Sequence, residues 1–336
     1  MFVVDAHAHI VPAHFPELSL GAAAQPAGWP SLLSLNDGRG RMMIDGHEFR
    51  TLDRAYFDLD SRLALMDREA IDMQVVSPLP ELLGYWLDTG VAVELARLTN
   101  ESVALTQAAA PRRIAGLGML PLQDISRAVA MVDEIVALGL RGIQVGSNVN
   151  GRSIADPAFD PLWEALAAHG LAVWVHGIRP AATERLIGPG MMGNVIGVPL
   201  DGTMAIASFI TTDVLARHPQ LKLGFAHGGG AIGALLDRMD FVWREYPAMR
   251  KTSSMSPREY VRRFHFDTVT YSVPYLRYLV DMVGADRLVC GTDGPTTGTQ
   301  YNCEAFVMEA CEGDASKAAS ILSGNAEAFF DLDDMT

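Results

Sequence analysis

The chain of 336 residues alternates eight times between a short apolar run and a longer segment with helical spacing. Apolar runs rich in β-branched residues and bounded by turn residues predict buried parallel strands, and the periodic segments predict amphipathic helices. Eight such units in a row predict a closed (β/α)8 barrel, the TIM-barrel fold of the α/β class. The expected strands span 2–10, 73–79, 114–120, 140–147, 171–177, 221–228, 264–269 and 287–293, and the expected helices span 59–70, 91–109, 125–138, 158–168, 203–217, 231–245, 274–284 and 303–330.

One long segment, residues 11–57, interrupts this alternation directly after the first expected strand. A connection of that length in a compact domain is usually functional or disordered. Turn signals at 36–38 and 45–46 predict a small hairpin inside it. We interpret the segment as an ordered lid inserted over the barrel mouth, and we treat residues 1–336 as a single domain.

Five polar residues lie at the carboxyl ends of the expected strands: His7, His9, His176, His227 and Asp293. Side chains alternate faces along a strand, so the His-x-His pair points both imidazoles to one side. The carboxyl ends of the strands form the active-site face of this fold. Neutral imidazole and carboxylate are the usual zinc ligands in proteins, and a catalytic site keeps one position open. The set therefore predicts a metal site.

The charge balance restricts the possible partners. A net charge of −14, without clusters of Lys and Arg, argues against a nucleic-acid or anionic-membrane surface. A small anionic substrate must then be held by a few placed arginines. Hydrophobic residues make up 49% of the chain, enough for the large core of an enzyme-sized domain.

Segments that would direct the chain to a membrane are not expected. No basic stretch followed by an apolar core opens the sequence, and no apolar run approaches the roughly 20 residues of a membrane span. The three cysteines contain no Cys-x-x-Cys pair, and their odd number excludes a fully paired disulfide framework. We expect reduced thiols in a soluble, cytoplasmic protein.

Six segments spread over nearly the whole chain combine the strand-end residues with their neighbours. They are Asp5-Ala6-His7-Ala8-His9-Ile10, Asp45-Gly46-His47-Glu48-Phe49-Arg50, Pro111-Arg112-Arg113-Ile114-Ala115-Gly116-Leu117-Gly118, Gly142-Ile143-Gln144-Val145-Gly146, Phe225-Ala226-His227-Gly228-Gly229-Gly230 and Gly291-Thr292-Asp293. With these segments the chain resembles the amidohydrolase superfamily. Within it, the chain is similar to the decarboxylase branch typified by 2-amino-3-carboxymuconate-6-semialdehyde decarboxylase, with γ-resorcylate and 5-carboxyvanillate decarboxylases as relatives.

The resemblance implies a division of roles among the strand-end residues. It implies that His7, His9, His176 and Asp293 bind one divalent transition metal, with water in the remaining position. It also implies that His227, beside the metal, acts as general base or acid. We expect zinc as the metal, although histidine and aspartate ligands also accept manganese and iron.

The resemblance also identifies two arginines that hold a substrate carboxylate. Arg50 lies in the inserted segment, and Arg238 lies on the helix after the sixth strand, from which it reaches across the interface of a homodimer. After the fifth strand the family has Pro-Trp-Asp, whereas this chain has Gly177-Ile178-Arg179. After Asp293 the family has an aromatic-Pro-Phe run, whereas this chain has residues 294–297, Gly-Pro-Thr-Thr.

Both departures lie where the substrate pocket is expected. We predict that Arg179 supplies a further contact to a substrate carboxylate. For each of the three arginines the alternative is an ion pair on the surface, which for Arg179 would be formed with Glu184.

These features predict a metal-dependent non-oxidative decarboxylase, a C–C lyase that acts on an unsaturated or aromatic carboxylic acid, with His227 and Asp293 as catalytic residues. One alternative is a metal-dependent hydrolase or hydratase of a small carboxylated substrate. The fourth strand lacks an obvious carboxylated lysine, which disfavours a binuclear hydrolase. Another alternative is a ligand-binding protein on a barrel that has lost its activity. His265 and Asp267 share one face of the seventh strand, either supporting the metal ligands or forming a hydrogen bond in the core.

Overall fold

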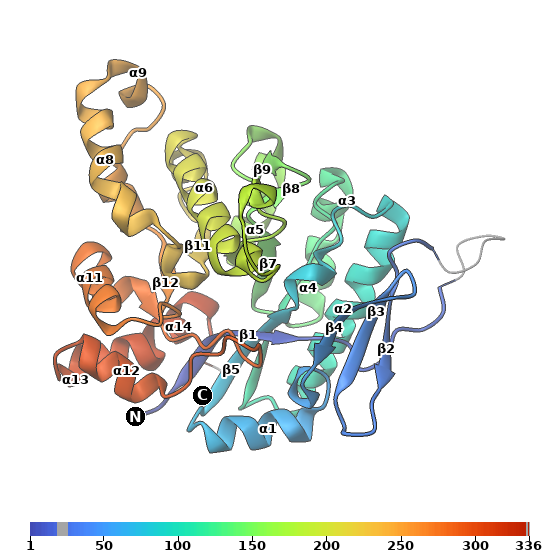
Figure 1. Cartoon of the computed structure of the whole chain (residues 1–336). Coiled ribbons are helices and arrows are strands. Elements are labelled where there is room, and N and C mark those ends of the chain that lie inside the picture. The colour runs from blue at the N-terminus through green and yellow to red at the C-terminus, as the bar shows by residue number, and fades with distance from the viewer. Residues whose placement is uncertain (19–25, 334, 336) are drawn as a thin grey trace.

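The computed structural model describes residues 1–18, 26–333 and 335 (Figure 1). Within them, eight parallel strands form one sheet in which the strands follow one another in chain order. Each coincides with an expected strand, so the predicted α/β barrel is confirmed. The strands are β1 (Val4–Ile10), β5 (Met73–Pro78), β6 (Ile114–Gly118), β7 (Gly142–Gly146), β10 (Ala172–His176), β11 (Lys222–Phe225), β12 (His265–Asp267) and β13 (Leu288–Val289).

Backbone hydrogen bonds join the first strand to the segment that follows the last one. The amide of Ala6 donates to the carbonyl of Cys290 at 2.7 Å, Asp293 donates to His7 at 2.8 Å, and His9 donates to Gly294 at 2.7 Å. A parallel bridge also pairs Ala8 with Gly294. The sheet therefore curls until β1 meets residues 290–294. This closure brings His7 and His9 on β1 next to Asp293.

Helices cover the outside of the sheet (Figure 1). The expected helix 125–138 is two helices that meet at Met131, and the expected helix 303–330 is three, first broken where Glu312 and Gly313 adopt positive φ. The helices are α1 (Leu59–Arg68), α2 (Thr89–Ala109), α3 (Ile125–Ala130), α4 (Val132–Ala137), α5 (Asp160–Ala168), α6 (Val198–Thr211), α7 (Val214–Arg217), α8 (Ile232–Glu245), α9 (Pro247–Arg250), α10 (Pro257–Val261), α11 (Val273–Val283), α12 (Cys303–Ala310), α13 (Ala315–Ala319) and α14 (Asn325–Phe330).

The expected helix 203–217 begins earlier than predicted and is two helices, α6 and α7, separated where Asp213 adopts positive φ. A π-helical turn at Gly193–Gly197 continues directly into α6, whose second residue is Pro199. The result, Gly193–Thr211, is one helix of 19 residues that is long and apolar enough to span a membrane by length and composition alone. The expectation that no apolar segment comes near this length is therefore wrong for this helix.

The inserted segment forms a small antiparallel sheet of β2 (Pro30–Ser34), β3 (Gly40–Ile44) and β4 (His47–Leu52). The hairpin between β3 and β4 turns at Asp45 and Gly46, both with positive φ, which suits a two-residue turn. The predicted hairpin is thus confirmed, whereas a lid function stays a prediction, and residues 19–25 lie outside the described residues. A second short hairpin joins β8 (Asn148–Val149) and β9 (Arg152–Ser153).

The lower end of the barrel interior is filled by aromatic side chains from α14. The ring centroid of Phe330 lies 6.0 Å from that of Trp174 on β10, and Trp174 in turn lies 6.1 Å from the ring of His7. His265 packs against Phe329 with ring centroids 4.4 Å apart, and burial lowers the pKa of His265 to about 4. His265 is therefore a half-buried residue that packs against this aromatic layer, and the layer forms the floor beneath the predicted site.

Replacing Phe330 with Ala should lower the free energy of unfolding by about 3–5 kcal/mol, because the ring is only 1% exposed and its loss leaves a cavity. Phe49 on β4 is 43% exposed, so Phe49→Ala should change it by less than about 0.5 kcal/mol. Urea unfolding of both variants measures this difference. Equal losses would show that α14 does not seal the barrel.

Candidate active site

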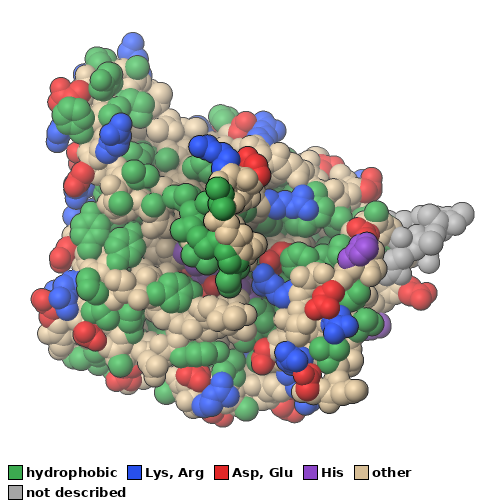
Figure 2. Space-filling model, in the orientation of Figure 1, with side chains coloured by type: hydrophobic (Ala, Val, Ile, Leu, Met, Phe, Trp, Pro, Cys, Tyr) green, Lys and Arg blue, Asp and Glu red, His purple; other side chains and the backbone are tan. Residues whose placement is uncertain are grey.

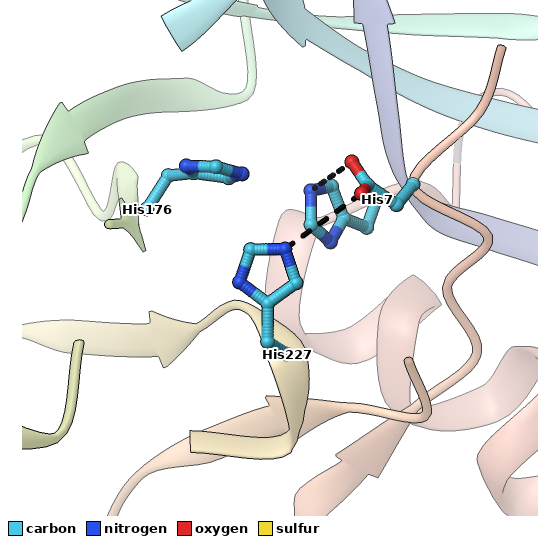
Figure 3. Close-up of side chains that lie close together, drawn as sticks. His7, His176 and His227 are labelled. Atoms are coloured by element: carbon cyan, nitrogen blue, oxygen red, sulfur yellow. Dashed lines mark ion pairs between the residues drawn. The ribbon is translucent and has the colours of Figure 1, made fainter. Parts of the chain in front are cut away.

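Three imidazoles converge above the aromatic floor (Figure 3). His7 comes from β1, His176 from the last position of β10, and His227 from the turn that follows β11. Their ring centroids lie 4.8–5.3 Å apart. With Asp293 they offer four ligand atoms that all lie within 4.8 Å of one another, an arrangement able to hold a metal ion.

His9 adds a further donor atom beside this group. Its Nε2 lies 3.2 Å from Nε2 of His7 and 3.1 Å from Oδ1 of Asp293, while Nε2 of His7 lies 3.4 Å from the same oxygen. Two ligand atoms placed roughly 2.0–2.1 Å from one tetrahedral metal are separated by roughly 3.3–3.4 Å. The spacing of these three atoms therefore fits a divalent metal.

The protonation states of His9, His176 and Asp293 also suit metal binding. Burial lowers the pKa of His9 to about 4 and holds the pKa of His176 well below its ordinary value, so both imidazoles are neutral at pH 7. Burial alone would raise the pKa of Asp293, but the neighbouring imidazoles of His227 and His9 hold it well below its usual range. Neutral imidazole and ionised carboxylate are the forms that bind metals.

Asp267 on β12 fixes the orientation of His7 by binding the ring nitrogen that faces away from the cluster. Its Oδ2 lies 2.6 Å from Nδ1 of His7, so the Nδ1–H donates to the carboxylate and Nε2 is left free toward the cluster. Asp267 also accepts the backbone N–H groups of His227 and Gly228, at 2.9 and 2.8 Å. One buried carboxylate thus positions both a β1 histidine and the turn that carries His227.

Several of the predicted residues have unusual backbone conformations. His227, Arg179 and Asp293 have φ values of 58°, 41° and 59°, a left-handed region that non-glycine residues occupy rarely. After His227, a Cβ on Gly230 would lie 2.0 Å from the carbonyl oxygen of Pro199. The three-glycine run therefore allows the turn to pack closely on α6.

The cluster lies at the base of a cavity of about 1240 Å³. Figure 2 looks into this hollow, with histidine and acidic side chains at its base. Part of the wall comes from the inserted segment, including Phe49 and Arg50, and an apolar wall comes from Trp86, Leu87, Val91, Met191 and Val195. A concave, mostly apolar pocket with a few polar groups is typical of a site for a small organic ligand.

The three predicted arginines occupy different environments. Arg50 lines the cavity and donates to Glu81, with Nη2 3.0 Å from Oε1. Arg179 also lines the cavity, and its guanidinium carbon lies 3.4 Å from the centre of the Trp86 ring. Among the described residues Arg179 has no carboxylate partner, so the alternative pair with Glu184 does not form. Arg238 is exposed on α8 and does not line the cavity of its own chain.

Sequence reasoning missed Glu81 and Trp86. Both follow β5 and therefore lie on the active-site face, which is the signal that could have identified them. Neither stands at a strand end, so the search for polar strand-end residues passed over them.

Comparison with known proteins now identifies the family, because the amidohydrolase family model matches residues 4–332. The chain belongs to the amidohydrolase family. A 2-amino-3-carboxymuconate-6-semialdehyde decarboxylase of Dictyostelium discoideum is 32% identical over 332 residues, which cover 98% of this chain and 92% of that protein. This relative confirms the predicted branch of the family and supports the prediction of a carboxy-lyase.

Solved structures agree with the fold. The apo structure of Metarhizium anisopliae IDCase has a TM-score of 0.82 at 23% identity and covers 100% of this chain and 98% of that one. A dihydroxybenzoic acid decarboxylase from Polaromonas, solved with bound manganese, has a TM-score of 0.71 at 21% identity and covers 83% of this chain and 88% of that one. The barrel architecture is therefore shared along most of the chain.

Replacing Asp267 with Asn should weaken binding of a divalent metal roughly 10- to 100-fold, because the amide no longer fixes the His7 tautomer with a charged acceptor. Competition with a chromogenic chelator measures the affinity. Asp286→Asn is the matched control, since the Asp286 side chain is 69% exposed and pairs with Arg287 instead of with a residue of the cluster. Unchanged metal affinity in Asp267→Asn would contradict this positioning role.

Proposed function

We propose that this protein is a metal-dependent non-oxidative decarboxylase that acts on an unsaturated or aromatic carboxylic acid. The observation that carries the proposal is the cluster of His and Asp donor atoms at the base of a cavity whose walls hold arginines. The nearly full-length similarity to a decarboxylase supports the same reaction class.

We assign His7, His9, His176 and Asp293 as the residues that hold the metal, and His227 as the proton carrier. The closer approach of His9 supports this division, because its Nε2 is 3.1 Å from Asp293, whereas Nε2 of His227 is 3.8 Å from that carboxylate. When bound, the metal supplies Lewis-acid stabilisation of negative charge. We expect zinc; manganese in the Polaromonas decarboxylase supports a site that also accepts manganese.

The reaction requires a proton at the carbon atom that loses carbon dioxide. The C–C bond breaks, its electron pair enters the conjugated system of the substrate, and His227 delivers a proton to that carbon as the new C–H bond forms. The carboxylate of Asp293 lies 3.8 Å from Nε2 of His227 and stabilises the protonated imidazole before transfer. The apolar wall of the cavity keeps water away from the carbon.

Two arginines face the cavity and can bind carboxylates. Arg179 is the better placed to take a carboxylate in a planar bidentate contact, because its guanidinium carbon lies 3.4 Å from the centre of the Trp86 ring and its N–H groups have no carboxylate partner among the described residues. Arg50 approaches from the inserted sheet and already donates to Glu81. We assign both to substrate binding.

We also propose a homodimer in which Arg238 contributes to the partner's site. Hydrophobic side chains gather on the surface over α6 and α8 (Figure 2), and the exposed ones include Leu200, Met204, Leu235 and Phe241. Large exposed apolar patches commonly mark protein interfaces. Arg238 is exposed on α8 and does not line its own cavity, which supports a contact with substrate in another chain.

Metal-loaded protein should release carbon dioxide from at least one member of a panel of aromatic and unsaturated carboxylic acids. His227→Asn should lower that turnover by roughly 10²–10⁴, because the amide cannot carry a proton. Coupled detection of carbon dioxide measures both rates. Products that keep their carboxylate would identify a hydrolase or hydratase, and unchanged turnover in His227→Asn would remove this residue from the mechanism.

Arg179→Met should lower kcat/KM for the true substrate by more than about tenfold, which corresponds to over about 1.4 kcal/mol. Methionine keeps the length and apolar body of the side chain but removes the cation. Arg185→Met, on the same loop and outside the cavity lining, is the control and should keep wild-type kinetics. Steady-state kinetics measure kcat/KM for both variants. A wild-type kcat/KM for Arg179→Met would contradict its role, and carboxylate binding would then fall to Arg50 and Arg238.

A further inference from the structure

The segment that joins His176 to Arg179 is held by the side chains of two residues that follow β7. The N–H of Ile178 donates to Oγ of Ser147 at 3.1 Å, and Asn148 donates to the carbonyl of Ile178 at 2.8 Å. Both backbone polar groups of Ile178 therefore bind side chains. The position of the residue directly before Arg179 thus depends on Ser147 and Asn148.

Asp201, in the first turn of α6, binds both of these side chains with one carboxylate oxygen. Its Oδ2 accepts from the hydroxyl of Ser147 and from Nδ2 of Asn148, the latter at 2.9 Å. Because the hydroxyl hydrogen of Ser147 points to the carboxylate, a lone pair of its Oγ is left for the N–H of Ile178. Asp201 and Ser147 are only 5% and 3% exposed, so these hydrogen bonds are shielded from bulk water.

The first turn of α6 also packs directly on this segment. A Cβ on Gly177 would lie 2.3 Å from the carbonyl oxygen of Val198, so the glycine permits a close approach. The helix therefore meets residues 177–178 with its backbone and with the side chain of Asp201. Together, Ser147, Asn148 and Asp201 form a polar brace between α6 and the segment after β10.

His176 and Arg179 depend on the polar brace to different extents. His176 belongs to β10, lies opposite Gly146 on β7, and accepts the backbone N–H of Ser147 at 2.8 Å. Arg179 lies beyond the strand end with a φ of 41°, a conformation of higher energy that persists only where the surrounding structure holds it. Removing a side chain of the brace should therefore release Arg179 and leave His176 in place.

We propose that Asp201 is a positioning residue for substrate binding, which acts through the polar brace on the backbone before Arg179. The guanidinium carbon of Arg179 lies 3.4 Å from the centre of the Trp86 ring, and both residues line the cavity. Fixing the backbone lowers the entropy that this long side chain loses when it is held there. The inference rests on the proposed function, because it requires that Arg179 binds a carboxylate.

The test measures binding of benzoate to the metal-loaded protein by calorimetry. Asp201→Ala and Ser147→Ala should each weaken binding about fivefold or more, a loss typical of residues that are coupled in one hydrogen-bond network. Asp201→Asn keeps an oxygen that accepts from Ser147, so it should restore the affinity to within about twofold of wild type. Ser254→Ala is the matched control, since Ser254 donates to Asp213 and neither residue lines the cavity.

A double-mutant cycle shows whether Asp201 acts through Arg179. In an Arg179→Met background, Asp201→Ala should weaken benzoate binding by less than about twofold, because the cation that the brace positions is already absent. Metal affinity, measured by competition with a chelator, should be unchanged in Asp201→Ala. If this variant does not fold, Ser147→Ala takes its place in the cycle, since it removes only a hydroxyl group.

Unchanged benzoate binding in both alanine variants would overturn the inference, and so would an equal further loss in the Arg179→Met background. Failure of Asp201→Asn to restore binding, weakened metal binding, or a wild-type protein that does not bind benzoate would also overturn it. The carbon dioxide assay separates the two proposals. Decarboxylation that does not depend on Asp201 contradicts only the positioning role, whereas the expected benzoate cycle in a protein that releases no carbon dioxide contradicts only the proposed reaction.

Discussion

The site depends on the hydrogen bonds that join β1 to residues 290–294. The amide of Asp293 donates to the carbonyl of His7, and the amide of His9 donates to the carbonyl of Gly294. Because these bonds fix the register between the two ends of the chain, they set the distances between His7, His9 and Asp293. The metal-binding atoms of these three residues lie within about 3.5 Å of one another. Without the closed sheet such polar atoms would separate and bind water instead.

A layer of buried polar groups supports this closure. Asp5 accepts hydrogen bonds from Thr292 at 2.6 Å and from Gln74 at 2.8 Å, and Gln74 in turn accepts from the buried Arg62 at 2.9 Å. Arg62 also donates to the carbonyl of His9. Buried charges are tolerated only when their hydrogen-bonding capacity is satisfied, and this network satisfies it while fixing the backbone beneath the metal-binding atoms.

The fold and the location of the site could be predicted because both follow from local patterns. The eight apolar runs specify the strands, and polar residues at their carboxyl ends must meet at one face, so His7, His176, His227 and Asp293 converge as expected. Contacts between loops could not be predicted, since the stacking of Arg179 on Trp86 depends on how the segments after β5 and β10 approach each other. The helix break at Met131 was missed because a single residue without glycine or proline interrupts an otherwise helical pattern, whereas Gly313 was an available signal for the break after α12.

The central claim is that His7, His9, His176 and Asp293 hold one divalent metal while His227 remains free for proton transfer. Elemental analysis of the purified wild-type protein and of the His9→Ala and His176→Ala variants tests it most directly. The account predicts about one equivalent of metal per chain in the wild-type protein and almost none in either variant. Full metal content in His9→Ala would contradict it and would transfer the fourth ligand position to His227.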